Sequence, residues 1–87
     1  PVVVEVGVAS IQVLAEATKR RGYLFLQNGS ATGTLWVRFD GGDASTSAWH
    51  LMLGPGSGKV IDRVPQGAIK AISDAVGTKI SCTALEW

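Results

Sequence analysis

The stretch LWVRFDGGD, Leu35–Asp43, decides the fold class of this chain. Its first five residues place apolar side chains at every second position, with Trp36 and Arg38 between them. This period of two is typical of a half-buried β-strand. Residues 40–43, DGGD, then end the strand, because aspartate and glycine favour turns. The stretch therefore predicts a strand over residues 35–39, with Trp36 on the face opposite to the core.

The same signals recur along the whole chain. Short alternating runs of β-branched and aromatic residues are separated by turn-rich stretches such as NGSATG and GPGSG, and this spacing indicates an all-β sandwich or barrel. The runs predict strands at residues 2–8, 11–15, 23–27, 35–39, 49–53, 59–64, 68–73 and 79–85. We therefore expect one all-β domain over residues 1–87, a jelly-roll-like β-sandwich with about eight short strands.

Residues 10–21, SIQVLAEATKRR, form the stretch where a helix competes with a strand. Most positions carry good helix formers, and Ile11, Leu14 and Ala15 would share one face of a helix. A lone helix would fit poorly in a chain that otherwise has the pattern of strands. A strand followed by a loop is therefore the favoured interpretation.

The composition argues against several classes of function. The chain has 87 residues, 46% hydrophobic and 17% charged, with a net charge of +1. This balance gives no electrostatic reason to expect nucleic acid or an anionic membrane as a partner, and no apolar run approaches the ~20 residues that span a bilayer. The chain has one cysteine, Cys82, and one histidine, His50, so multi-cysteine and multi-histidine metal sites are excluded. We expect no metal and no cofactor.

The low share of charged residues, below the ~25% usual for globular domains, has a consequence for the surface. So few charges cannot cover a small protein, and some apolar surface should be left for contacts. A domain of this size also buries only ~60% of its unfolded surface, so an oligomer or another partner would add useful burial. The N-terminus lacks the features of a signal peptide, so we expect the product to be made and used without secretion.

The stretch LGPGSGKV, Leu53–Val60, raises the question of phosphate binding. A nucleotide-binding P-loop needs a glycine in place of Leu53, a serine or threonine in place of Val60, and a helix after the lysine. None of these requirements is met. Pro55 and Gly56 instead suit the central positions of a reverse turn, so the stretch predicts a turn between two strands.

Catalytic side chains also form no convincing pattern. A Ser-His-Asp triad can be drawn around His50 from Asp40, Asp43, Ser45 and Ser47. However, no serine lies in a nucleophile turn, and nothing obvious would supply an oxyanion hole. Cys82 stands in an alternating apolar run and is most simply a small core residue. We therefore expect that the protein is not an enzyme.

Three groups of side chains are candidates for contact with a partner. An exposed tryptophan can stack on a sugar ring or fill a pocket of another protein. The cluster at residues 19–21 is either a solvated loop or a site of ion pairs with a neighbouring chain. Residues 1–8 are either an ordinary first strand or an arm that adds to another subunit's sheet. The candidate residues are Val2, Val3, Val4, Arg20, Arg21, Trp36, Trp49 and Trp87.

Four segments of the chain, taken in order, carry a resemblance to a known family. They are RRGYLFLQN (Arg20–Asn28), LWVRFDGG (Leu35–Gly42), LGPG (Leu53–Gly56) and VPQGAIKAIS (Val64–Ser73). Together they resemble the small all-β structural proteins encoded in tailed-bacteriophage genomes. Some of those proteins decorate or cement the capsid, and others form modules of tails and fibres. The resemblance covers residues 13–84 and rests on strand and turn features.

The resemblance implies a viral structural protein that decorates and stabilises a capsid by bridging subunits of the major capsid protein. It implies a homo-oligomer, a dimer or trimer, that is made in the host cytoplasm and lies on the outside of the virion. Binding only the assembled lattice would stabilise that state by mass action. Residues 2–4, Trp49 and Trp87 would be apolar anchors, and residues 20–21 a polar rim. The alternative is a tail or fibre module that recognises a surface carbohydrate through an exposed tryptophan, Trp36 or Trp49.

Overall fold

The computed structural model of the chain describes residues 2–61 and 63–86. Within these residues the chain forms eight strands and no helix. The strands are β1 (Val2–Val6), β2 (Ile11–Leu14), β3 (Arg21–Asn28), β4 (Leu35–Arg38), β5 (Leu51–Leu53), β6 (Gly58–Val60), β7 (Ile69–Ser73) and β8 (Thr78–Glu86). The strand-and-loop interpretation of residues 10–21 is confirmed. No helix in the described part of the chain is long and apolar enough to cross a membrane.

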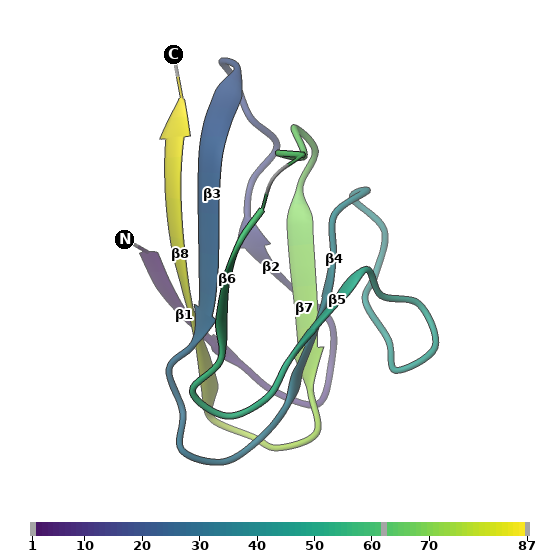
Figure 1. Cartoon of the computed structure of the whole chain (residues 1–87). Helices are drawn as coiled ribbons and strands as arrows, with labels where there is room; N and C mark the ends of the chain where they lie inside the picture. Colours follow the sequence, from purple (N-terminus) through teal and green to yellow (C-terminus); the bar gives the residue numbers. More distant parts are fainter. Residues whose placement is uncertain (1, 62, 87) are drawn as a thin grey trace.

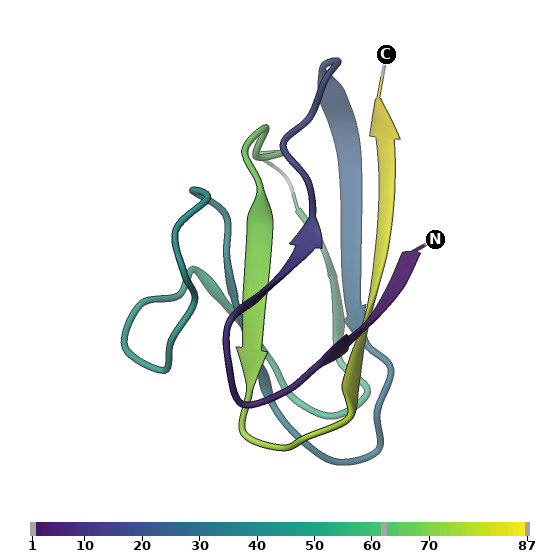
Figure 2. The same ribbon diagram turned by 180° about the vertical axis from the view of Figure 1, so that it is seen from behind.

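The strands form two four-stranded sheets. Sheet A has the order β1-β8-β3-β6 and sheet B the order β2-β7-β4-β5, and all neighbouring strands are antiparallel. The two sheets form two layers, with the long strands β3 and β8 in one layer and β4 and β7 in the other (Figures 1 and 2). The predicted all-β sandwich is therefore confirmed.

The strand pairs are nested along the chain. In sheet A, β1 pairs with β8 and β3 pairs with β6, whereas in sheet B, β2 pairs with β7 and β4 pairs with β5. Successive pairs therefore alternate between the two sheets. This arrangement places residues that are far apart in the sequence on the same face of one sheet.

The core lies between the sheets and follows from the alternation of side chains along each strand. The buried apolar residues that pack together in this core are Val6, Val13, Leu24, Leu26, Leu35, Val37, Leu53, Ile69, Ala71, Ile80 and Cys82. Cys82 is thus a core residue, as predicted. Trp36 stands between two buried residues of β4 and lies on the opposite, outer face, as the alternation also predicts.

A β-bulge in β3 turns Arg21 into the interior. The register between β3 and β8 shifts between Arg21 and Tyr23, and such a shift re-aims the side chains beside it. The guanidinium of Arg21 donates hydrogen bonds to the carbonyl oxygens of Pro65 (2.6 Å), Gly67 (3.3 Å) and Ala15 (2.9 Å), so it ties two loops together. The expected place of Arg21 at an exposed polar rim is wrong, because this residue is only 1% exposed.

The GPGSG stretch forms the predicted turn, which connects β5 to β6. The amide of Ser57 donates to the carbonyl oxygen of Gly54 at 3.0 Å. Gly56 has a φ angle of 74°, a left-handed conformation that glycine adopts without strain. Lys59 belongs to a strand rather than to a helix, so this stretch is not a P-loop.

Six of the predicted strands are shorter than expected, among them those at residues 49–53 and 59–64. The strand expected at residues 49–53 begins at Leu51, because His50 belongs to the preceding loop and accepts a hydrogen bond there. The strand expected at residues 59–64 ends at Val60. Residues 2–6 form the first strand of the chain's own sheet A, which is one of the two interpretations that the sequence leaves open.

Candidate docking surface

The outer face of sheet A carries three rows of residues without charged side chains. Residues that stand directly opposite each other in an antiparallel sheet point to the same side. The register therefore aligns the outward-pointing residues as Val3-Ser81-Gln27-Gly58, Thr83-Phe25-Val60 and Leu85-Tyr23. We refer to these residues as the uncharged face.

The uncharged face is largely apolar and open to solvent. The exposed fractions are 62% for Val3, 56% for Leu85, 47% for Val60 and 37% for Tyr23. These four residues, one from each strand of sheet A, leave on the order of 400 Å² exposed, which is in the range of the largest patch on a typical monomer. Patches of this size often have a function.

Phe25 lies in the middle row of this face and depends on a glycine in the next strand. A Cβ atom added to Gly58 would lie 2.9 Å from Cζ of Phe25 and 3.3 Å from its Cε1. Carbon atoms do not pack that closely without displacement. The missing side chain at position 58 therefore lets the aromatic ring extend over β6.

Charged side chains begin at the border of the uncharged face. The next row pairs Glu5 of β1 with Lys79 of β8, at the end of the sheet away from Leu85. Lys59 of β6 stands opposite Leu26, a core residue, so it does not point to the outer face. Interface cores are depleted of charged residues and enriched in aromatic ones. The uncharged face has this composition.

The outer face of sheet B is different in kind. One row is apolar and consists of Met52, Trp36 and Ile72, and the neighbouring row contains Arg38 opposite Lys70. Both cations are paired with the loop that follows β4. Arg38 Nε lies 2.6 Å from Asp40 Oδ1, and Lys70 Nζ lies 3.2 Å from Asp43 Oδ1.

Within this charged row, the carboxylate of Asp40 accepts hydrogen bonds from both a side chain and the backbone. Hydrogen bonds from the Arg38 side chain and from the backbone amide of Gly42 lower the pKa of Asp40 to about 2. Arg38 also donates to the backbone carbonyl of Asp43 at 3.2 Å. These contacts hold the loop against β4, and they pair the charges of this row with other residues of the same chain.

The residues from which a catalytic triad can be drawn have other roles. His50 Nδ1 accepts a hydrogen bond from the amide of Phe39 at 3.0 Å, and the two rings stack with centroids 5.6 Å apart. The hydroxyl groups of Ser45 and Ser47 lie 3.2 Å from each other. Among the residues that the structure describes, no hydrogen bond joins a serine to this histidine, and no group of three or more His, Cys, Asp or Glu residues could hold a metal ion.

The Cys82 thiol lacks the setting of a reactive cysteine. It is 2% exposed, and burial raises its pKa to about 11, although the positive charge of Arg21 acts in the opposite direction. The thiolate is the nucleophilic form of cysteine. This thiol is therefore protonated at neutral pH.

The predicted contact residues at the start of the chain and in the basic cluster lie in different environments. Val3 is part of the uncharged face, whereas Val2 and Val4 alternate with it and point to the inner side of β1. Arg20 is exposed in the loop before β3, and Arg21 is in the interior. The structure therefore brings Val3 alone of these five residues into the uncharged face.

Two of the three predicted tryptophan contacts, Trp36 and Trp49, lie away from sheet A. Trp36 is half-buried on the outer face of sheet B. Trp49 lies in the loop between β4 and β5, where it is 42% exposed and its Nε1 donates to the carbonyl oxygen of Thr46 at 3.1 Å. Trp87 lies outside the described residues.

Sequence reasoning missed most of the uncharged face. The residues not singled out include Tyr23, Phe25, Val60 and Leu85, which supply much of its apolar surface. A signal was present in β3, because this strand has apolar residues in both phases of its alternation, and β8 adds Leu85 to its outward phase. One phase fills the core, so the other phase must be exposed or covered by a partner.

Comparisons with known proteins assign no family to this chain. No protein-family model, no curated protein and no solved structure matches it. The function must therefore be argued from the surfaces of the molecule.

Proposed function

We propose that this chain is a viral structural protein that decorates and stabilises a bacteriophage capsid on the outside of the virion. It binds subunits of the major capsid protein through the uncharged face. The observation that carries the proposal is this apolar surface, which has an aromatic residue in its middle row and lies on the paired strands of a β-sandwich. The identity of the assembly rests on the resemblance of residues 13–84 to small structural proteins of tailed phages.

The physical form of the uncharged face suits docking. Its residues stand on paired strands and need little ordering when a partner binds, so less of the binding free energy is lost. The exposed area, on the order of 400 Å², is below the ~800 Å² per partner of a standard interface. A homo-oligomer that presents two or three such faces gains affinity through effective concentration. Binding only to the assembled shell then stabilises that state.

We also assign the sandwich to the jelly-roll type. The support is the nested pairing of β1 with β8, β2 with β7, β3 with β6 and β4 with β5, in alternating sheets. Jelly rolls occur in viral capsid proteins and in lectins. The assignment therefore agrees with the capsid proposal and with its carbohydrate-binding alternative, and the surfaces decide between them.

The proposal is tested with expanded phage shells that lack the protein. The shells are mixed with purified protein and sedimented, and the bound copies and the melting temperature of the shells are measured. We expect saturable binding at high copy number and a higher melting temperature. Val60→Lys, on the edge strand β6 of sheet A, should reduce binding at least tenfold because it places a charge in the interface core.

Met52→Lys is the matched control for this experiment. Met52 lies on the edge strand β5 of sheet B and is 53% exposed, compared with 47% for Val60. The Met52 variant should bind shells like the wild type. If no protein binds the shells, the capsid proposal is wrong. If Met52→Lys abolishes binding and Val60→Lys does not, the docking surface lies on sheet B.

A tail or fibre module that recognises a surface carbohydrate is the second candidate. It is favoured by the apolar row that contains Trp36 and by Trp49, which is 42% exposed. An aromatic ring of this kind can stack on a sugar. This function predicts a change in tryptophan fluorescence with host surface glycans that Trp36→Ala or Trp49→Ala removes, together with no binding to shells.

A further inference from the structure

Asn28 is the only asparagine of the chain, and Gly29 follows it directly after the end of β3. The side-chain amide of an asparagine can react with the backbone nitrogen of the next residue, which makes asparagine a thermolabile residue. A glycine at that next position leaves the nitrogen unhindered, because glycine has no Cβ atom. The reactivity of this pair of residues therefore depends on how the fold holds its atoms.

The side chain of Asn28 is buried and is held by three hydrogen bonds. It is 0% exposed. Its Nδ2 donates to the carbonyl oxygens of Gly33 at 2.9 Å and Leu53 at 3.2 Å, and its Oδ1 accepts from the amide of Ser30 at 3.0 Å. The side chain therefore joins the end of β3 to the loop that follows it and to β5. These contacts keep the amide group from turning toward Gly29.

The backbone around the bond between Asn28 and Gly29 is held as well. The amide of Asn28 donates to the carbonyl oxygen of Ser57 at 2.8 Å. The amide of Gly29, whose nitrogen would attack the side chain, donates to the carbonyl oxygen of Lys79 at 2.9 Å. Attack requires this nitrogen to lose its proton and to approach Cγ of Asn28. The reaction therefore requires a local or global opening that breaks these hydrogen bonds.

We propose that Asn28 and Gly29 form a spontaneous modification site that the fold keeps inactive and that opening of this corner activates. In the opened chain, the Gly29 nitrogen loses its proton to the solvent and forms a bond to Cγ of Asn28. The bond between Cγ and Nδ2 breaks, and the nitrogen leaves as ammonia after taking up a proton. Water then opens the resulting succinimide ring to aspartate or isoaspartate. In sum, asparagine and water give the acid and ammonia, so the reaction needs neither an enzyme nor an oxidant.

The product does not fit the native arrangement of this corner. A carboxylate at position 28 only accepts hydrogen bonds, so the carbonyl oxygens of Gly33 and Leu53 lose their donor and face a buried negative charge. Isoaspartate also adds one carbon atom to the main chain of β3. Unsatisfied polar groups and unpaired charges in the interior are strongly destabilising. The modification therefore marks a chain that has opened and disfavours its return to the fold, with or without a capsid as partner.

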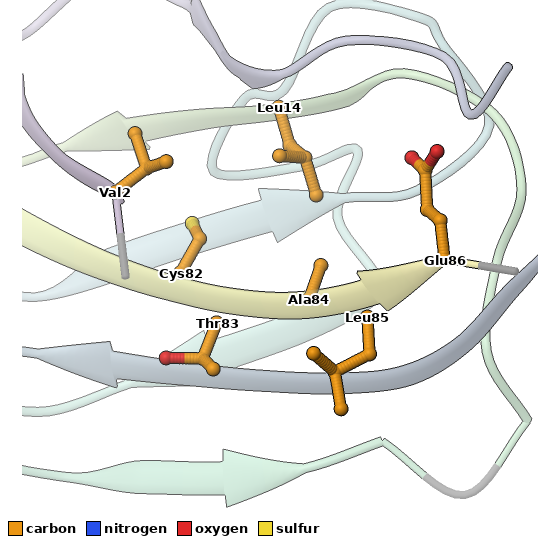
Figure 3. A pocket seen from close by; sticks show the side chains of 7 residues that line it. All are labelled: Val2, Leu14, Cys82, Thr83, Ala84, Leu85 and Glu86. Atoms are coloured by element: carbon orange, nitrogen blue, oxygen red, sulfur yellow. The ribbon is translucent and has the colours of Figure 1, made fainter.

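Cys82 and Met52 can also change in mass without an enzyme, by oxidation. Met52 is exposed. Cys82 is 2% exposed, but together with Leu14 and Ala84 it lines a hollow of about 480 Å³, and it points to the same side of β8 as Ala84 (Figure 3). Oxidation adds oxygen atoms to a sulfur side chain, whereas the reaction of Asn28 replaces an NH₂ group by a hydroxyl group. Mass spectrometry of proteolytic fragments therefore distinguishes these changes.

The test compares the full-length protein folded in buffer with the same protein unfolded in guanidinium chloride, at one mildly alkaline pH and one temperature. The fraction of acid at position 28 is measured over time. The folded protein should react at least about tenfold more slowly, because only its open fraction reacts. Gly29→Ala is the control, since its Cβ atom would lie 3.8 Å from the carbonyl oxygen of Lys79, an ordinary contact. Its unfolded chain should react several times more slowly than the unfolded wild type.

The consequence of the modification is tested with Asn28→Asp, and Gln27→Glu is its matched control. Both variants replace an amide by a carboxyl in β3, but Gln27 is exposed on the outer face and Asn28 is buried. Asn28→Asp should lower the melting temperature by at least about 5 °C, and Gln27→Glu should leave it nearly unchanged. The inference is wrong if the folded and unfolded wild type react at the same rate, if the unfolded chain keeps its asparagine, or if the two variants melt together. An Asn28→Asp chain that does not fold would be the extreme of the expected loss, and the two wild-type rates would still decide.

Discussion

On both sheets, successive side chains point alternately to the core and to the outer face, but the residues on the two outer faces differ in kind. On sheet A the outward residues form the uncharged face around Phe25. On sheet B the apolar row around Trp36 lies beside a row in which Arg38 and Lys70 are paired with aspartates. Both sheets bury aliphatic residues inward, so the core does not require this difference. A docking surface is therefore better marked by connected rows without charge than by one exposed tryptophan.

The energetics of binding also distinguish the two faces. A partner that covers sheet B must desolvate two ion pairs and satisfy their remaining hydrogen-bonding groups. A partner that covers the uncharged face removes mainly apolar surface from water, which is favourable. The polar side chains of Ser81, Thr83 and Gln27 in this face can still form hydrogen bonds with the partner. Docking through sheet A therefore has the lower cost in polar desolvation.

Replacing the aromatic residue of each face gives the largest expected effect. Phe25 and Trp36 are both half-buried, and each stands on an internal strand of its sheet. Phe25→Ala should weaken binding to expanded shells at least tenfold, since aromatic residues within an interface are typical hot spots. Trp36→Ala should leave shell binding unchanged. Sedimentation at several protein concentrations measures both affinities. The opposite result would transfer the docking surface to sheet B.

The close approach of Phe25 to β6 provides a second, smaller effect. Gly58→Ala places a Cβ atom 2.9 Å from the half-buried ring, so the ring must move, and forcing it off its rotamer costs about 0.5–1.5 kcal/mol of unfolding free energy. Gly54→Ala is the matched control, since its nearest contact would be Ser57 Oγ at 3.8 Å. Its effect should stay within about 0.5 kcal/mol. Urea denaturation measures both.

A double-mutant cycle shows whether the ring causes the cost at position 58. In a Phe25→Ala background, Gly58→Ala should lose most of its effect, because the atom that it would meet is gone. A cost of the same size in both backgrounds would mean that the glycine is needed for the backbone alone. The glycine at position 58 would then not determine where the ring of Phe25 lies on the uncharged face.

Features that depend on one strand at a time could be predicted from the sequence. The alternation around Trp36 and the turn at residues 53–58 are local, so strand positions, the outward tryptophan and the all-β class followed from them. Arg21 shows where local reasoning ends. A basic residue beside an apolar strand has the pattern of a solvated loop, and the one-residue bulge that turns it inward leaves no clear signal in the sequence.

The uncharged face depends on strand order, which spacing alone does not provide. Its first row joins Val3, Ser81, Gln27 and Gly58, and these residues meet because β1, β8, β3 and β6 are neighbours in sheet A. Without the strand order, each apolar residue is one exposed side chain among others.

The Arg38–Asp40 pair in the charged row of sheet B should make the smallest contribution to stability, and this contribution is measured at acid pH. The pKa of Asp40 is lowered from 3.8 to about 2 in the folded chain, mainly by the hydrogen bond from Arg38. The stability that this group contributes is therefore present above pH 4 and is lost as the pH falls toward 2. The effect is modest because the pair is exposed and salt screens it.

The melting temperature, measured from pH 5 to pH 2 at low and high salt, isolates this contribution. Asp40→Asn should flatten part of the acid slope that the wild type shows, and high salt should reduce the difference between the two proteins. The sheet A variant Phe25→Ala should keep the wild-type slope, because its change lies on the other face. If Asp40→Asn keeps the full slope as well, the Arg38–Asp40 pair does not form in solution. Sheet B would then have a free cation on its surface, and the electrostatic contrast between the two faces would need to be revised.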